Sequence, residues 1–212
     1  MTDTDDWAAR TEAQVLDEAL KRAPALGWTW PMTYAAGQAA GLTRPETELL
    51  LPRGPADLAA LLSRRLDEGA LQRLEGVDPA GLKIRQRIRT AVEARLESAA
   101  AHEPAVRRWA GWCALPLNLP LAMRLLWESA DVLWRWAGDV ATDENHYSKR
   151  AILSGILCGA LAIRLSGGHA DAMAFVDARI ENVMAYEKWK AGLRPGDLLK
   201  DIAGALGRMR YG

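Results

Sequence analysis

The apolar positions of the chain recur at intervals of three and four residues, a spacing that is typical of helices. Alternating runs of β-branched residues are absent, and alanine, leucine, arginine and glutamate dominate. The sequence therefore predicts an all-α fold. The first helix should end at Gly27 and carry its apolar stripe at Val15, Leu16, Ala19, Leu20 and Ala23.

Two short helices should follow the first. Thr29 is placed to cap one of them. Thr43 and Glu46 have the spacing of a capping box and should begin the other, which Pro52 ends. Three short helices in succession predict a helix-turn-helix module over residues 1–57.

Prolines and glycines divide the remaining chain into further helices. Breaks are expected at Pro116, Pro120 and Gly138, and about ten helices result in all. The predicted organisation has three parts, which are the module at 1–57, a larger helical domain at 58–192 and a C-terminal helix at 193–212.

The charge pattern argues against nucleic acid as a partner. Basic and acidic residues balance over the whole chain at 27 each. The module at residues 1–57 holds five basic against nine acidic residues. Specific DNA binding depends heavily on cationic contacts to phosphates, so the module is expected to repel DNA.

The compartment is predicted from the N-terminus and the cysteines. The first ten residues are acidic and match neither a secretion signal nor an arginine-rich transit peptide, so the mature protein is expected to start here. No apolar run approaches the roughly 18 residues that a membrane-spanning helix needs. Cys113 and Cys158 lie among apolar neighbours and are expected to be buried thiols in a reducing cytosol.

Motifs for catalysis are not found in the sequence. Asp139, Asp143 and His146 could line one helix face and ligate a metal, but Gly138 argues against a continuous helix there. Glu-x-x-His, Gly-x-Ser-x-Gly and the glycine-rich phosphate loops do not occur. We therefore expect a protein that is not an enzyme and holds no metal.

A stripe of small residues at Ala151, Gly155, Gly159 and Ala162 permits two interpretations. Such a stripe lets two helices approach closely, or it leaves room for an apolar ligand. The tryptophans gathered between residues 109 and 136 favour a cavity. Its expected lining residues are Trp112, Leu115, Met123, Leu126, Trp127, Ile152, Gly155, Ile156 and Gly159.

The C-terminal segment predicts an amphipathic helix. A basic bias allows such a helix to lie in a lipid interface, although packing on the protein's own core is an equally good interpretation. The residues expected to contact a membrane are Leu198, Leu199, Ile202, Leu206 and Met209.

Two stretches of the chain resemble a known family. "LPLNLP" and "LWRWAGDVATDENHYSKRAILSGIL" are similar to the coenzyme Q biosynthesis protein nine family of ubiquinone-biosynthesis accessory proteins. The matching positions are Leu115, Pro116, Asn118, Pro120, Trp134, Ala137, Gly138, Asp139, Thr142, Asp143, Asn145, Tyr147, Arg150, Ala151, Leu153, Gly155 and Ile156.

The resemblance implies a TetR-regulator-like fold and a homodimer, with lipid binding and dimerisation in residues 58–192. It implies no cofactor. The ligand would be an isoprenoid quinone intermediate or another lipid, which the protein presents to the di-iron demethoxyubiquinone hydroxylase. The residues implied to dock that partner are Asp143, Asn145, His146, Tyr147 and Arg150.

The chain departs from the family pattern at His146, where mitochondrial relatives carry a tryptophan. A smaller, titratable ring there could weaken the docking contact. The absence of a transit peptide favours a bacterial cytoplasmic protein that is peripheral at the inner membrane. The alternative functions are a TetR-like lipid-sensing transcriptional regulator and a purely structural scaffold.

Overall fold

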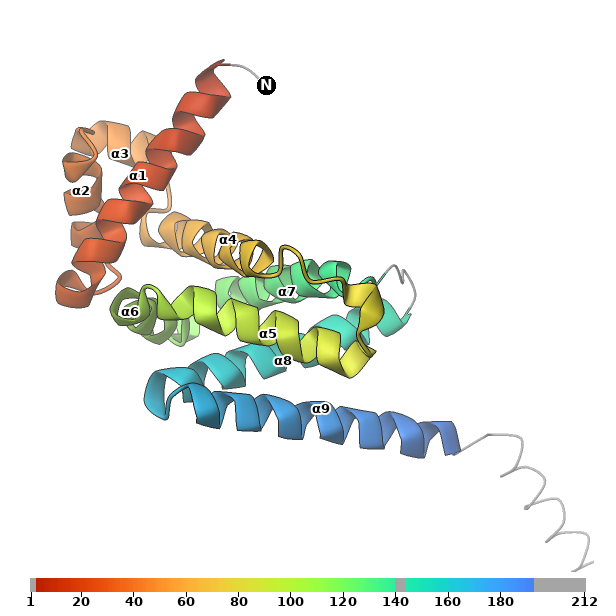
Figure 1. The fold of residues 1–212 in the computed structure, drawn as a ribbon. Coiled ribbons are helices and arrows are strands. Elements are labelled where there is room, and N and C mark those ends of the chain that lie inside the picture. The colour runs from red at the N-terminus through yellow and green to blue at the C-terminus, as the bar shows by residue number, and fades with distance from the viewer. Residues whose placement is uncertain (1–2, 140–143, 193–212) are drawn as a thin grey trace, which may run out of the picture.

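The structure is a computed structural model that describes residues 3–139 and 144–192 (Figure 1). These ranges form nine α-helices, two 3-10 turns and no strand. The bounds are α1 Asp3–Leu26, α2 Trp30–Ala39, α3 Arg44–Leu50, α4 Pro55–Arg73, η1 Pro79–Gly81, α5 Ile84–Ala100, α6 Glu103–Cys113, η2 Pro116–Asn118, α7 Leu119–Trp136, α8 Glu144–Ser166 and α9 His169–Gly192.

The predicted class is confirmed: an N-terminal helix-turn-helix module precedes a helical bundle in a TetR-regulator-like arrangement. The predicted domain boundaries, at residues 57/58 and 192/193, stay a prediction. The expected helix at 193–212, including Leu198, Leu199, Ile202, Leu206 and Met209, lies outside the described residues. None of the described helices is long and apolar enough to cross a membrane.

The helices of the N-terminal module begin where their caps predict. The Thr29 hydroxyl accepts a hydrogen bond from the Met32 amide at 3.3 Å and begins α2. The expected capping box of α3 is present, because the Glu46 carboxylate accepts from the Thr43 amide at 2.7 Å and the Thr43 hydroxyl accepts from the Glu46 amide. Both short helices are therefore encoded locally.

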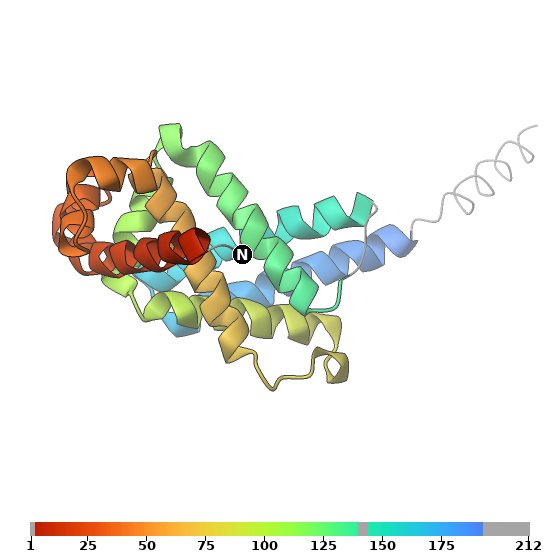
Figure 2. The same cartoon turned by 90° about the horizontal axis from the view of Figure 1, so that it is seen from above.

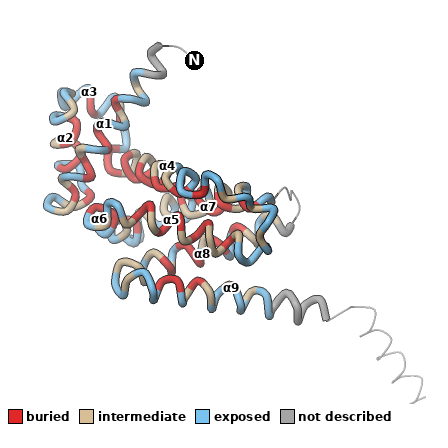
Figure 3. The backbone as a smooth tube through the Cα atoms, in the orientation of Figure 1, coloured by how far each residue is buried: buried red, intermediate tan, exposed pale blue. Residues whose placement is uncertain are grey.

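The module lies at one end of the bundle, and α4 runs from it into the bundle (Figure 2). The Trp28 indole donates to the Pro55 carbonyl at 2.8 Å and holds α4 against the module. Figure 3 shows that α4, α5 and α7 each carry buried stretches, and buried polar groups join these three helices. Arg95 donates to Asp67 at 2.6 Å, and Ser129 donates to the same carboxylate at 2.8 Å.

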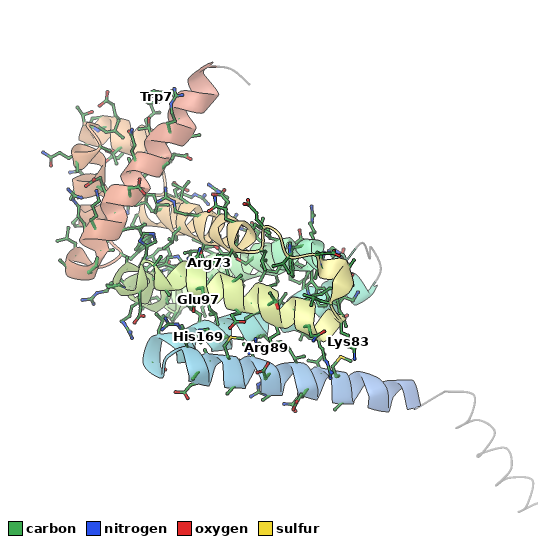
Figure 4. All side chains as sticks on the ribbon, in the orientation of Figure 1. Trp7, Arg73, Lys83, Arg89, Glu97 and His169 are labelled. Carbon is green, nitrogen blue, oxygen red and sulfur yellow. The ribbon has the colours of Figure 1, made fainter. Side chains whose placement is uncertain are left out.

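The helix α9 packs along α8 and α5. Figure 4 labels Arg89 and Glu97 of α5 and His169 of α9 at this contact. Arg89 donates to Asp177 of α9 at 2.8 Å, and His169 Nδ1 lies 2.9 Å from Glu97. These polar contacts between α5 and α9 are partly exposed, so we expect each to contribute little to stability.

Candidate ligand cavity and docking surface

The bundle surrounds an apolar cavity of about 370 Å³ between α4, α5, α6, α7 and α8, which opens to solvent beside Met123 and Cys158. This volume lies within the range of known small-molecule sites. The polar lining residues are Ser63, Arg95 and Ser129. The apolar lining residues are Leu96, Trp109, Ala110, Cys113, Ala114, Leu119, Ala122, Met123, Leu125, Leu126, Leu157, Cys158, Leu161 and Ala162.

The polar side of this cavity is internally paired. Arg95 is 6% exposed and its charge is compensated by Asp67. Ser129 donates to Asp67 and lies 3.5 Å from Ser63. Because these groups satisfy one another, the cavity presents mainly hydrocarbon surface to a ligand.

Of the residues that the sequence predicts to line one cavity, Met123 and Leu126 line this one. Trp112 lines none of the three hollows that the structure describes. Leu115 directly precedes the turn η2 and is about half exposed. Trp127 packs against the ring of Tyr147 on α8. For these three, the tryptophan-rich and leucine-rich pattern did not distinguish lining the cavity from lying beside it.

The predicted residues of α8 face a different hollow. Ile152, Gly155 and Ile156 line an open groove of about 480 Å³ against α9. Ile152 and Ile156 also line a groove of about 370 Å³ that reaches α5. The enclosed cavity instead meets Leu157, Cys158, Leu161 and Ala162, which lie further along α8 toward its C-terminal end.

Gly159 supports the first interpretation of the small-residue stripe, which is close packing of two helices. A Cβ at this position would lie 2.6 Å from the Phe175 ring, whereas a Cβ at Gly155 would meet nothing within 4 Å. Gly159 therefore permits close packing of α8 on α9 and does not line a described hollow. Sequence spacing alone could not separate these two glycines, because both belong to the same stripe.

A buried arginine supports the surface where the partner was predicted to dock. Arg150 is 2% exposed, and its guanidinium donates to Asp131 at 2.6 Å and to Asp139 at 3.0 Å. Lys149 donates to the second oxygen of Asp139 at 2.7 Å. The prediction that Arg150 itself forms part of the docking surface is therefore wrong, because its side chain is enclosed by its own chain.

The tryptophan and glycine of the same motif fix the junction between α7 and α8. The Trp134 indole donates to the Lys149 carbonyl at 3.1 Å. Gly138 has φ +87, a left-handed conformation that favours glycine at a helix end. The Arg87 guanidinium donates to the adjacent Ala137 carbonyl at 2.8 Å. The motif residues thus act together to set the direction in which α8 leaves α7.

The electrostatics of this junction favour the charged carboxylate. Burial by itself would raise the pKa of Asp139, but hydrogen bonds from Lys149 and Arg150 outweigh burial and bring the pKa below its ordinary value. Each Asp139 oxygen accepts a hydrogen bond from one of these two cations. No group of three or more metal-binding side chains occurs in the described ranges.

Aromatic side chains cover the outer side of the junction. Tyr147 is 64% exposed, with its ring centroid 6.1 Å from that of Trp127 and 5.2 Å from that of His146. We call these three residues the aromatic patch. Asp143 lies outside the described residues, and Asn145 belongs to α8 without a described side chain.

The two cysteines differ in their surroundings, and both are free. Burial raises the pKa of the Cys113 thiol to about 12, as expected of an inert thiol in an apolar wall. Cys158 is exposed, so the prediction of a buried thiol was wrong there. Both residues line the enclosed cavity, which places Cys158 on its open side.

Comparison with known proteins adds a family to this geometry. The family model described as COQ9 matches residues 119–187, which hold α7, the aromatic patch and most of α9. The chain is 34% identical over 124 residues to the Xenopus laevis mitochondrial ubiquinone biosynthesis protein COQ9-A, covering 56% of this chain and 35% of that protein. It is 29% identical to the rat and 28% identical to the human mitochondrial ubiquinone biosynthesis protein COQ9, each over 193 residues and 85% of this chain.

The fold and the cavity define a helical protein of the TetR-like class with an apolar cavity. Within that class, the chain is similar to the COQ9 family, whose named members here are ubiquinone biosynthesis proteins. The chain spans 61% and 60% of the rat and human proteins and about a third of the Xenopus one. These relatives are mitochondrial by name, so a bacterial inner-membrane location stays a prediction.

Proposed function

We propose that the protein is an accessory factor of ubiquinone biosynthesis that binds isoprenoid quinone intermediates and presents them to the di-iron demethoxyubiquinone hydroxylase. The chemistry would belong to the hydroxylase, and this chain would act as a homodimeric lipid carrier. The observation that carries the proposal is the enclosed apolar cavity with a single polar side.

The dimensions and lining of the cavity suit such a ligand. Known sites of comparable size are mostly apolar and orient the ligand through a few polar groups. Trp109 lines the cavity, and its buried indole N–H has no acceptor within the described ranges. A quinone or hydroxyl oxygen near this wall would supply an acceptor, while the isoprenoid chain would occupy the remaining hydrocarbon surface.

The aromatic patch supports docking of a partner protein. Tyrosine and tryptophan provide large contact areas at low cost in side-chain entropy and are enriched in protein interfaces. Beneath the patch, Arg150 and Asp139 hold the start of α8 in place. In this proposal Tyr147, Trp127 and His146 contact the hydroxylase, and Arg150 acts only by positioning them.

The test of lipid carriage is mass spectrometry of organic extracts from the purified protein. Ala162→Trp fills the cavity from α8, and Ala174→Trp adds the same bulk at an exposed position of α9 that lines no described hollow. Co-purified isoprenoid quinones should be lost from the first variant and retained by the second. A lipid-free wild-type extract, or equal lipid content in both variants, would contradict carriage in this cavity.

Docking is tested with Tyr147→Ala and a matched control, Trp7→Ala, which removes an aromatic ring of similar exposure from α1. Tyr147→Ala should weaken capture of the purified hydroxylase by about tenfold, the effect of losing one central interface side chain, without a change in Tm. An equal effect of the two substitutions would count against this patch as the docking surface.

The rival function, a lipid-sensing transcriptional regulator, draws on the helix-turn-helix module. Arg44 of α3 stacks over Tyr34 and pairs with Glu48, and Arg53 pairs with Asp57. These guanidinium groups already have acidic partners, which weakens the case for phosphate contacts. Specific retention of genomic DNA fragments in a low-salt gel shift would favour the regulator over the carrier.

We also propose that the protein associates peripherally with a membrane through residues 197–212. Deleting this segment should lower flotation with liposomes while the remaining chain keeps its helical circular dichroism. Unchanged flotation would remove the segment from the proposal.

A further inference from the structure

The segment from Leu115 to Met123, which holds η2 and the start of α7, exposes four large apolar side chains to solvent. Leu117 is 92% exposed, Met123 70%, Leu115 52% and Leu119 46%. Burying a leucine from water is favourable by about 1.5–3 kcal/mol, and this cluster forgoes that gain within nine residues of sequence. Apolar exposure that is gathered in one place indicates a contact surface.

The turn holds these side chains outward by its own hydrogen bonds. The Asn118 side-chain amide donates to the Trp112 carbonyl at 2.8 Å, and the Asn118 backbone amide donates to the Leu115 carbonyl at 2.9 Å. Pro116 and Pro120 fix the backbone on either side of Asn118. The turn thus holds Leu117 almost fully in solvent, while Leu115 and Leu119 are about half exposed.

The exposed cluster continues into the enclosed cavity. Leu119 and Met123 line the cavity and are also largely exposed, so they form part of its mouth. Leu117 lies two residues before Leu119 in the chain. An apolar ligand leaving the cavity here would meet the leucines of the turn before it met open water.

The charge pattern around the cluster suits a lipid surface. No charged residue occurs in the fifteen positions from 109 to 123, and Arg107, Arg108 and Arg124 flank them. Arg107 and Arg124 are about half exposed and pair with Glu103 and Glu128, so the charges at the border of the cluster are balanced. An uncharged apolar tip matches a bilayer, where its leucines can enter the acyl region.

We propose that the η2 turn, with Leu117 at its tip, inserts into the lipid bilayer and places the cavity mouth directly against the acyl chains. The inference deepens the proposed function, since it rests on the cavity being the lipid site. Its occupant is a bilayer rather than a protein because leucine contributes weakly to protein hot spots and the exposed tip lacks aromatic rings. A polyprenyl chain would then pass between membrane and protein without being hydrated.

The first test compares Leu117→Glu with Leu49→Glu in the full-length chain. Leu49 is 82% exposed on α3 in the N-terminal module, so it is a matched control away from the mouth. In sedimentation with vesicles of zwitterionic and anionic phospholipids, Leu117→Glu should lower the partition coefficient at least about tenfold, the expected loss for a buried leucine. Leu49→Glu should leave it unchanged. Equal partitioning of both variants and the wild type would overturn the proposal.

A second test reads insertion directly. Cys158→Ser removes the exposed thiol, and Leu117→Cys or Leu49→Cys then carries a nitrobenzoxadiazole label. On vesicles, the fluorescence emission of the label at position 117 should shift to shorter wavelength and be quenched by brominated phospholipids. The emission of the label at position 49 should show neither change. An unquenched label at 117 would overturn the proposal, as would a Leu117→Glu variant that keeps vesicle binding but loses self-association or hydroxylase capture.

The two proposals fail in different ways. If the purified protein contains no isoprenoid but Leu117→Glu still abolishes vesicle binding, the membrane contact stands and lipid carriage fails. If the protein carries isoprenoid and the label at position 117 stays in water, carriage stands and the insertion of the turn fails.

Discussion

Replacing Arg150 with methionine removes the cation that joins the end of α7 to the start of α8. Methionine keeps much of the buried volume but leaves Asp131 and Asp139 without their shared guanidinium. Breaking a buried ion pair from one side typically costs about 3–5 kcal/mol. Lys149 still compensates Asp139 and Arg135 still compensates Asp131, so we expect the lower end, about 3 kcal/mol.

This loss corresponds to a decrease in Tm of about 6–12 °C for a chain of this size. The assay is urea unfolding followed by circular dichroism at pH near 7. The matched control is Arg135→Met, which removes the other arginine that pairs with Asp131. Arg135 has a side chain that is 73% exposed, and its loss should cost less than about 1 kcal/mol.

The pH dependence gives the same prediction a second readout. The pKa of Asp139 is lowered in the folded protein, so its ion pair stabilises the fold above the unfolded pKa of about 4 and is lost as pH falls through the lower folded pKa. The difference in stability between wild type and Arg150→Met should therefore shrink on acidification. Equal losses for the two arginine variants, or a difference that does not depend on pH, would refute the assignment of Arg150 as a buried anchor.

Two further predictions concern α8 and the cavity wall. Gly159→Ala should destabilise the fold by about 1–3 kcal/mol because its methyl group would overlap the Phe175 ring. Gly155→Ala should instead be neutral or stabilising by up to about 1 kcal/mol, since its Cβ meets open space and alanine favours helix; a reversed order in thermal melts would refute the packing described. Ellman's reagent at pH about 8 should titrate Cys158 rapidly and Cys113 only after denaturation, because burial raises the Cys113 pKa to about 12. Rapid reaction of two thiols in the native protein would contradict this difference.

Local sequence patterns determined the helices and their ends. The apolar spacing, the Thr29 cap and the Thr43–Glu46 capping box act within one or two helical turns, so they can be interpreted without knowledge of the fold. The family resemblance also depended on the linear order of motif residues. These signals were sufficient for the all-α class, the acidic N-terminal module and the similarity to the family.

Only the tertiary structure decided which side of each helix meets which neighbour. Ile152 and Gly155 face α9, whereas Cys158 and Ala162 face the enclosed cavity, although all four lie on one helix. Arg150 looked like a surface cation in the motif and is a buried anchor, because carboxylates from α7 and the following turn enclose it. Burial and ion pairing depend on contacts between segments distant in sequence, and the helical period by itself does not specify those contacts.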